Sequence, residues 1–261
     1  MIVKPRVLLA LLLIVAVSVP LAAAAVQRGG IFGMLRSNGY PNVEYDGKFT
    51  FARVRYRPVG GRRGGGGWAA DYPTMEQNLT SMMKEITSVP LHLDGSNVHD
   101  LDDPDLLKYP VAYLSEPGYW YPSDSEVAGL RAFIDKGGFF IVDDFHYPNE
   151  WAVFEDAIRR VLPAARIDRL DDSHPVFNSF FHIKSLHVPY PGDLGERGLY
   201  GEFYGIHQDN DPTKRLAVVI DYNMDIGDYV EWAQSSRAYS FEPTNEAYKF
   251  MINYVIYGLT H

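Results

Sequence analysis

The fold is decided by the stretch 123–146, which reads S-D-S-E-V-A-G-L-R-A-F-I-D-K-G-G-F-F-I-V-D-D-F-H. Ser123 and Glu126 have the spacing of a capping box, which predicts the start of a helix. Apolar residues then recur at helical spacing, and Gly137 is the glycine that typically follows a helix. The next run, 139–142, is apolar on both faces, as in a central strand of a parallel sheet. The stretch therefore predicts a helix followed by a fully buried strand.

The alternation of strands and helices continues on both sides of this stretch. Three further segments have the apolar character of strands: 49–56, 111–114 and 216–220. Helices are predicted from Thr74, where Gln77 completes a second capping box, from Asn149 as a cap, and over 245–259. Strands that alternate with helices imply right-handed β-α-β crossovers. We therefore predict a single α/β domain with a mostly parallel sheet and helices on both faces.

The first residues have the pattern of a secretory signal peptide. Lys4 and Arg6 precede an apolar run, 7–17, which is followed by Pro20 and a stretch of alanines. A positive start, an apolar middle and a small-residue end are typical of a segment that is removed on export. The apolar character continues to Val26, so an uncleaved membrane anchor is the alternative.

These patterns divide the chain into three parts. Residues 1–25 form the predicted signal peptide, 26–48 a tether, and 49–261 the α/β domain. No segment after the first part approaches a membrane span, so we expect none in the mature chain. The expected location is periplasmic or secreted, or at the membrane through the N-terminal segment.

Charge and composition exclude several classes of function. The formal net charge is −9 and no basic stripe is present, which excludes nucleic acid as a partner. The chain has no cysteine, so it has neither a disulfide nor a cysteine nucleophile nor a thiolate metal site. The motifs of serine hydrolases and zinc proteases are missing from the sequence. No organic cofactor is predicted. The carboxylates and imidazoles could bind a divalent metal, which remains an alternative.

Five motifs carry a family resemblance. They are F-A-R-V-R-Y (51–56), G-G-G-G-W-A-A-D-Y-P (64–73), L-R-A-F-I-D-K-G-G-F-F-I-V-D-D (130–144), D-D-S-H-P-V-F (171–177) and I-N-Y-V-I-Y-G-L (252–259). With these motifs the chain resembles the bacterial domain-of-unknown-function family 4159 (DUF4159) over 49–260. The resemblance implies a flavodoxin-like fold related to the class I glutamine amidotransferases. Similar domains occur with von Willebrand-type and MoxR-type envelope proteins, which suggests the kind of protein partner to expect.

In active amidotransferases of that fold, a cysteine lies on the sharp turn after a central strand. The corresponding turn here is Asp143-Asp144-Phe145-His146. The resemblance therefore does not imply a Cys-dependent amidotransferase, and the family itself has no assigned activity.

The predicted sheet also locates a functional crevice. In parallel sheets, ligands bind beyond the carboxyl ends of the strands. The segments that follow the predicted strands are 57–72, 115–121, 143–147 and 221–228, and they hold most of the unusual residues.

Asp144, His146 and His174 are the candidate catalytic residues. Adjacent residues of a strand point to opposite faces, so only one of Asp143 and Asp144 can face the crevice. Beyond the strand end, the turn can bring Asp144 to His146, and a carboxylate beside an imidazole can orient a general base or bind a metal. His174 could fold back over the crevice as a second imidazole. The alternatives are that Asp144 caps its own turn and that His174 belongs to a polar turn fixed by Pro175.

Aromatic and acidic residues around the strand ends are candidate ligand contacts. They are Trp68, Asp71 and Tyr72 before the first helix, Glu116, Tyr119 and Trp120 after the strand 111–114, and Asp143. Aromatic faces stack on sugar rings while carboxylates accept hydrogen bonds from hydroxyls. The alternatives are core packing for the aromatic rings and support of a helix N-terminus for Asp71.

Two other patterns are weaker. The glycine-rich stretch 60–67 offers Arg62 and Arg63 to an anion but lacks the spacing of a phosphate loop, which favours a simple loop. Asp221, Asn223 and Asp225 resemble part of a calcium loop, but the glycine and glutamate that follow are displaced by one position, which favours a polar turn.

Together these patterns predict an exported cell-envelope domain that is non-catalytic or weakly catalytic. Its crevice would bind a polar small molecule, a glycan or an envelope protein partner. The first alternative is a metal-assisted or acid/base hydrolase that uses Asp144, His146 and His174 with Asp71 or Glu116. A scaffold that docks a protein partner through its sheet or its C-terminal helix is the other alternative.

Overall fold

The structure, a computed structural model, describes residues 42–57, 67–93, 96–236 and 239–261. Val43–His261 form one compact unit, which contains the fold. The predicted signal peptide, most of the predicted tether, and Arg62 and Arg63 lie outside the described residues.

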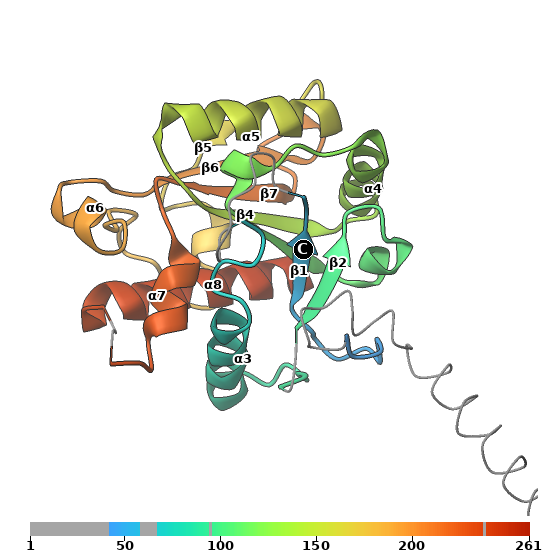
Figure 1. The fold of residues 1–261 in the computed structure, drawn as a ribbon. Helices are drawn as coiled ribbons and strands as arrows, with labels where there is room; N and C mark the ends of the chain where they lie inside the picture. Colours follow the sequence, from blue (N-terminus) through green and yellow to red (C-terminus); the bar gives the residue numbers. More distant parts are fainter. Residues whose placement is uncertain (1–41, 58–66, 94–95, 237–238) are drawn as a thin grey trace, which may run out of the picture. The chain divides into compact units, whose positions relative to one another are not determined.

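The described residues form one seven-stranded sheet with the order β2-β1-β3-β4-β7-β6-β5 (Figure 1). Its strands are β1 (Ala52–Arg55), β2 (Asn97–Asp100), β3 (Val111–Ser115), β4 (Phe139–Phe145), β5 (Asp168–Arg169), β6 (Glu202–His207) and β7 (Leu216–Tyr222). The five strands β2, β1, β3, β4 and β7 are neighbours in this order and pair in parallel. Strand β6 pairs antiparallel with both β7 and β5. The prediction of a mostly parallel, flavodoxin-like sheet is therefore confirmed.

Helices cover both faces of this sheet, as predicted (Figure 1). They are α3 (Thr74–Ile86), α4 (Asp124–Asp135), α5 (Tyr147–Val161), α6 (Asp193–Glu196), α7 (Ile226–Trp232) and α8 (Phe241–Thr260). One hydrophobic core joins the sheet to α3, α7 and α8, and a second core joins its other face to α4 and α5. Each strand residue that faces a helix layer therefore loses contact with water.

Strand β4 occupies the centre of the sheet, as the apolar run predicted. Phe139 and Ile141 belong to the core under α8, while Phe140 and Val142 belong to the core under α4 and α5. All four side chains are at most 1 % exposed. A strand buried on both faces can carry polar groups only where it ends, which is where the candidate site residues begin.

Two of the three predicted helix caps differ from the structure. The capping box of Ser123 and Glu126 at α4 is confirmed. The box predicted at Thr74 is wrong, since Pro73 is the N-cap of α3 and no side chain caps it. The cap predicted at Asn149 is also wrong: His146 is the N-cap of α5, and the helix begins at Tyr147 because the chain enters it directly from β4.

No helix in the described ranges combines the length and the apolar character that a membrane crossing requires.

Trp120 belongs to the core rather than to a ligand platform. It follows the short 3-10 turn Pro117–Tyr119, is 0 % exposed, and packs in the core shared with α5. This corrects the expectation that its ring faces a ligand, because no part of the ring reaches the surface.

The burial of Trp120 predicts a large cost for its removal. Trp120→Ala should lower the free energy of unfolding by about 3–5 kcal/mol, because it leaves a cavity in a close-packed core. The neighbouring Tyr121 is 50 % exposed, so Tyr121→Ala should change it by only about 0.5 kcal/mol. Urea denaturation of the two variants checks this, and equal effects would contradict the placement of Trp120.

Candidate functional site

A cavity of about 600 Å³ lies at the carboxyl ends of β1, β3, β4 and β7. The sequence predicted the crevice at these strand ends. Its lining contains the carboxyl groups of Asp71, Glu116, Asp144, Glu150, Asp225, Asp228 and Glu231. Among the described residues that line it, His146 is the one basic side chain and none is lysine or arginine. The cavity is therefore strongly acidic.

Asp143 faces away from this cavity and anchors α7. Its Oδ1 accepts the amide N–H of Ile226 at 3.1 Å, and its Oδ2 accepts the amide N–H of Gly227 at 2.9 Å and the Tyr113 hydroxyl at 2.9 Å. Burial raises the pKa of Asp143 to about 6, while these hydrogen bonds act to lower it. Asp143 is 0 % exposed, which corrects the expectation that it contacts a ligand.

Asp144 lines the cavity, so only one of the two adjacent carboxylates faces it, as strand alternation predicted. Its Oδ2 accepts the Ser115 hydroxyl at 3.1 Å. Burial raises the pKa of Asp144 well above its usual value, and the charges of Asp71, Glu116 and Asp143 raise it further.

Asp71 reaches the same cavity from the loop that follows β1. Its Oδ2 is buried and accepts no hydrogen bond. Arg53 holds the loop in place, because its guanidinium donates to the main-chain carbonyls of Trp68 and Ala70 and to Glu76. Burial raises the pKa of Asp71 well above its usual value, and the positive charge of Arg53 opposes the rise.

Asp71 also packs tightly against the start of α7. A side chain at Gly227 would overlap its Oδ2 and the Tyr113 hydroxyl. Glycine is therefore the residue that allows the loop after β1 and the helix after β7 to approach this closely.

Three of the acidic residues have left-handed backbone conformations. The φ angles are 62° at Asp71, 47° at Glu116 and 64° at Asp144. Each costs on the order of 1 kcal/mol in a non-glycine residue, and such residues concentrate at functional sites. The lining of the cavity therefore contains three residues with strained backbone.

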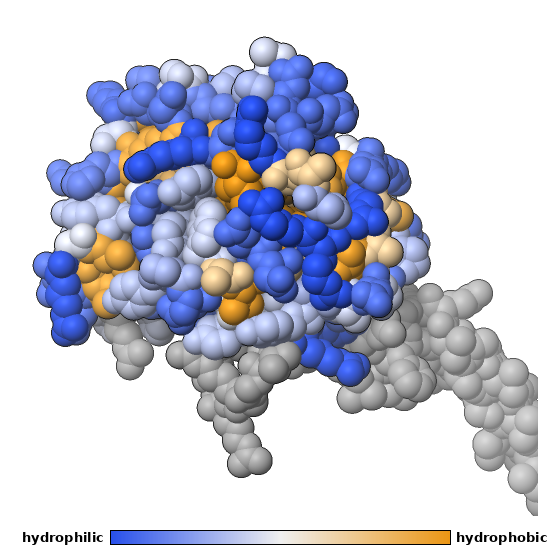
Figure 2. Space-filling view, turned by 90° about the horizontal axis from the view of Figure 1, so that it is seen from above, coloured by the Kyte–Doolittle hydropathy of each residue, from blue (hydrophilic) through white to orange (hydrophobic). Residues whose placement is uncertain are grey.

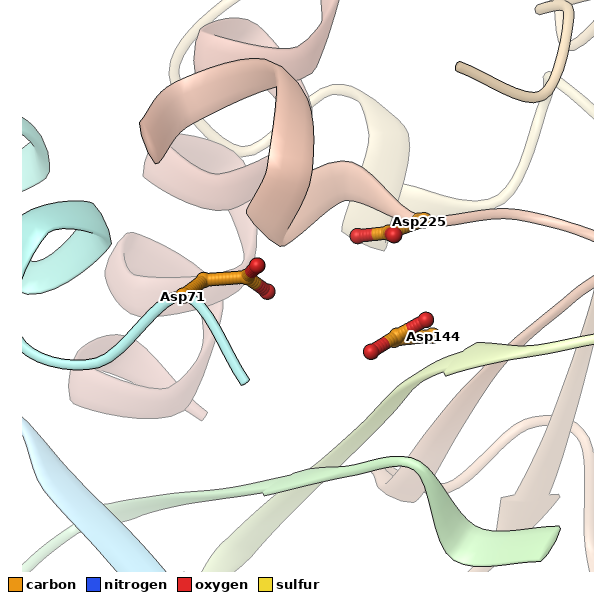
Figure 3. Close-up of side chains that lie close together, drawn as sticks. All are labelled: Asp71, Asp144 and Asp225. Atoms are coloured by element: carbon orange, nitrogen blue, oxygen red, sulfur yellow. The ribbon is translucent and has the colours of Figure 1, made fainter. Parts of the chain in front are cut away.

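Asp225 is the N-cap of α7, where its Oδ1 accepts the amide N–H of Asp228 at 2.8 Å. It is 7 % exposed. Burial and then the charge of Asp144 raise its pKa well above the usual value. In Figure 3, the carboxyl groups of Asp71, Asp144 and Asp225 point toward a common space, and one oxygen of each lies within 4.8 Å of the others.

Aromatic side chains complete the wall of the cavity. Tyr72 and Tyr119 line it as predicted, and Tyr190 and Trp232 join them. Trp68 does not line it but packs against Tyr72, with ring centroids 6.0 Å apart. The site thus combines carboxylates with aromatic rings, as the sequence suggested, although with partly different residues.

His146 lies at the cavity beside Asp144, as predicted. Its amide N–H donates to Glu150 at 2.8 Å, and its ring Nδ1 is buried without a hydrogen-bond partner. The same Nδ1 lies 3.6 Å from Oε2 of Glu150, so the imidazole lines the site with a carboxylate beside it.

Residues 50–259 match the family model described as "Domain of unknown function (DUF4159)". The chain belongs to this family. No curated protein matches the chain. The family description assigns no activity to the DUF4159 domain, so the function has to be argued from the cavity.

His174 of the DUF4159 domain lies at the opposite end of the strands, near the amino end of β7. Its Nε2 is 3.2 Å from Nε2 of His207, which ends β6 and pairs with Leu216, the first residue of β7. The carboxyl ends of the parallel strands are on the other side. The structure therefore does not bring His174 to Asp144 and His146, and the expected three-residue catalytic group is not formed.

The predicted site residues did not include six acidic and aromatic residues of the lining: Glu150, Tyr190, Asp225, Asp228, Glu231 and Trp232. Asp225 and Asp228 lie in the segment 221–228, which the sequence placed at the crevice, but only a calcium loop was considered there and its spacing did not fit. The general rule for strand ends was the better guide. Tyr190 comes from a segment without predicted structure, so the sequence carried no signal for it.

The different environments of Asp143 and Asp144 predict opposite responses to the same substitution. Asp143→Asn should lower the free energy of unfolding by about 1–3 kcal/mol, because the new amide N–H₂ would face donors. Asp144→Asn should leave it unchanged or raise it, because it removes like-charge repulsion and asparagine tolerates a left-handed backbone. Urea denaturation without added ligand checks both, and an equal loss in the two would contradict the site geometry.

The histidine pair of the DUF4159 domain predicts a loss of stability in acid. Burial and then His207 lower the pKa of His174 from 6.5 to about 4. As the pH falls from about 6.5 to about 4, the unfolded chain therefore binds more protons than the folded chain, and the free energy of unfolding decreases. His174→Gln removes this contribution, so the difference between variant and wild type should shrink across this window. Parallel stability curves would contradict it.

Proposed function

We propose that this chain is an exported cell-envelope domain that binds a polar ligand in the acidic cavity. One observation carries the proposal: seven carboxyl groups and several aromatic rings converge on one cavity at the carboxyl ends of the parallel strands. A cavity of about 600 Å³ is within the range of small-molecule sites. Export is supported by the pattern of Lys4, Arg6 and the apolar run 7–17.

The charge of the cavity selects the class of ligand. Carboxylates repel phosphates and other anions, whereas they accept hydrogen bonds from hydroxyl groups and attract cations. The rings of Tyr72, Tyr119, Tyr190 and Trp232 offer faces that suit the C–H surface of a sugar. A neutral or positively charged polar molecule, such as a glycan, is therefore the proposed ligand.

Binding is favoured over catalysis by the same residues. Acyl and phosphoryl transfer develop negative charge, which enzymes stabilise with preorganised donors or cations. The side chains that line this cavity are instead mainly acceptors. The chain also has no cysteine to act as the amidotransferase nucleophile.

A hydrolase is the second candidate, and His146 is the observation in its favour. Its ring lines the cavity beside Asp144, and its Nδ1 lies 3.6 Å from Oε2 of Glu150. An imidazole next to a carboxylate can act as a general base. This candidate now rests on Asp144 and His146 without His174.

Two further proposals concern ancestry and partners. The sheet order β2-β1-β3-β4-β7 and the turn Asp143–His146 after the central strand support a relationship to the class I glutamine amidotransferases. An envelope protein of the von Willebrand or MoxR type is the proposed macromolecular partner, supported by the family resemblance alone.

The ligand proposal predicts selective thermal stabilisation of the full chain. Neutral sugars, amino sugars and polyamines should include a stabilising ligand, while inorganic phosphate and nucleotides should have no effect. At about 100 times its dissociation constant, a ligand adds about 2.7 kcal/mol of stability, which raises the melting temperature by roughly 5–10 °C. Asp144→Asn should abolish this shift without unfolding the domain.

Stabilisation by phosphate or nucleotides instead, or by no compound of the panel, would contradict the proposal. Chromatography of the same samples separates the two candidates. Cleavage of a bound sugar that is lost in His146→Gln would select the hydrolase, whereas an intact ligand supports the binding domain.

A further inference from the structure

Three aspartates from three separate segments meet on one side of the cavity. Asp71 follows β1, Asp144 ends β4, and Asp225 precedes α7 (Figure 3). One oxygen from each lies within 4.8 Å of the other two. Two ligands that are each about 2.4 Å from one ion can be at most about 4.8 Å apart. Each pair of these oxygens meets that limit, so the three carboxyl groups can share one ion after small side-chain adjustments.

These carboxyl groups have few hydrogen-bond partners for buried charges: Asp144 accepts one hydrogen bond from Ser115, and Asp225 one from the amide of Asp228. Asp71 has a buried oxygen that accepts no hydrogen bond. Asp144 and Asp225 are 8 % and 7 % exposed, and their carboxyl groups face each other. Two carboxylates in such a position need a shared proton or a cation between them.

No lysine or arginine of the described residues forms an ion pair with Asp71, Asp144 or Asp225. Arg53 is the nearby cation, but its hydrogen bonds go to Glu76 and to main-chain carbonyls. Hydrophilic residues cover most of the face seen in Figure 2, with smaller apolar patches between them. A small cation from solution can therefore supply the charge that the protein does not.

We propose that Asp71, Asp144 and Asp225 bind a divalent cation that prefers oxygen ligands, such as Mg²⁺, Mn²⁺ or Ca²⁺. The ligand set contains carboxylate oxygens and neither a thiolate nor an imidazole, which selects these ions over Zn²⁺. Three protein oxygens leave coordination positions open toward the cavity. The hydroxyl groups of a bound polyol can occupy them, so this inference rests on the proposed function and extends it.

The neighbouring group of Asp71, Asp228 and Glu231 also has compatible oxygens. Both oxygens of Asp228, however, already accept hydrogen bonds, from Trp232 Nε1 at 2.7 Å and from the Tyr239 hydroxyl at 2.5 Å. The first group therefore has the freer ligands, and Glu231 provides a matched control.

The test is calorimetric titration of the full chain, stripped with a chelator, with Mg²⁺, Mn²⁺, Ca²⁺ and Zn²⁺ in separate experiments. We expect one hard cation to bind with a stoichiometry of one. Asp225→Asn should weaken its binding at least about tenfold, and so should Asp71→Asn. Glu231→Gln removes one charge from the same cavity and should leave the affinity within about twofold.

Asp225→Asn is designed to keep the fold intact. Asparagine is also a good N-cap, so the hydrogen bond from Asp228 is retained. The chelated variant should melt at the same temperature as the chelated wild type or higher, while the cation should raise the melting temperature of the wild type alone. A variant that melts lower in chelator would mean that Asp225 acts through the fold, which would overturn this part of the assignment.

The remaining outcomes separate this inference from the proposed function. Absence of binding by every hard cation, preference for Zn²⁺, or equal binding by Asp71→Asn, Asp225→Asn and wild type would each overturn the cation site. If a sugar still stabilises the chelated protein, the ligand proposal stands without the cation. If neither cation nor sugar binds, both fail together.

Discussion

The site depends on the hydrogen bonds of one buried carboxylate, Asp143. Its two oxygens receive the first amides of α7 and the hydroxyl of Tyr113 on β3. This fixes the helix that follows β7 against the end of β4, and favourable interaction with the helix N-terminus offsets part of the cost of burying the charge. Asp144 follows with a left-handed backbone, φ 64°, where the pairing of β4 with β7 shifts register, and its side chain lines the cavity. The same anchor places Asp225, the N-cap of α7, opposite Asp144.

A second buried charge, Arg53, positions the loop on the other side of the cavity. Arg53 on β1 holds the loop that carries Asp71 through two main-chain carbonyls, and Glu76 neutralises it. The guanidinium of Arg53 thus positions the loop, and it forms no hydrogen bond with the carboxylates that face the cavity. None of the carboxylates that face the cavity therefore forms an ion pair with Arg53, although its charge still opposes the rise that burial causes in the pKa of Asp71. Perturbed carboxylates in a cavity are typical of functional sites.

The sequence was sufficient for the architecture but only for half of the site. Apolar runs such as 139–142 and the box at Ser123 identify a parallel sheet with helices on both faces, because burial pattern and local capping are encoded within short windows. It could not tell which of Asp143 and Asp144 faces the ligand, since that depends on where α7 packs. It also could not place His174. This residue contacts His207 at the end of the antiparallel strand β6, which was not predicted and which ends beside the amino end of β7. Trp120 was misplaced for a similar reason: an aromatic residue after a strand looks the same in sequence whether it enters the core or the crevice.

The close approach of Asp71 to the start of α7 ties two distant positions together in evolution. A side chain at residue 227 would meet both the carboxylate of Asp71 and the hydroxyl of Tyr113. Positions 71 and 227 should therefore change together among relatives of this domain, in those that also lack the hydroxyl at position 113. In such relatives the helix start is free to accept a side chain, so these aligned columns would separate family members that retain this cavity chemistry from those that keep the fold alone.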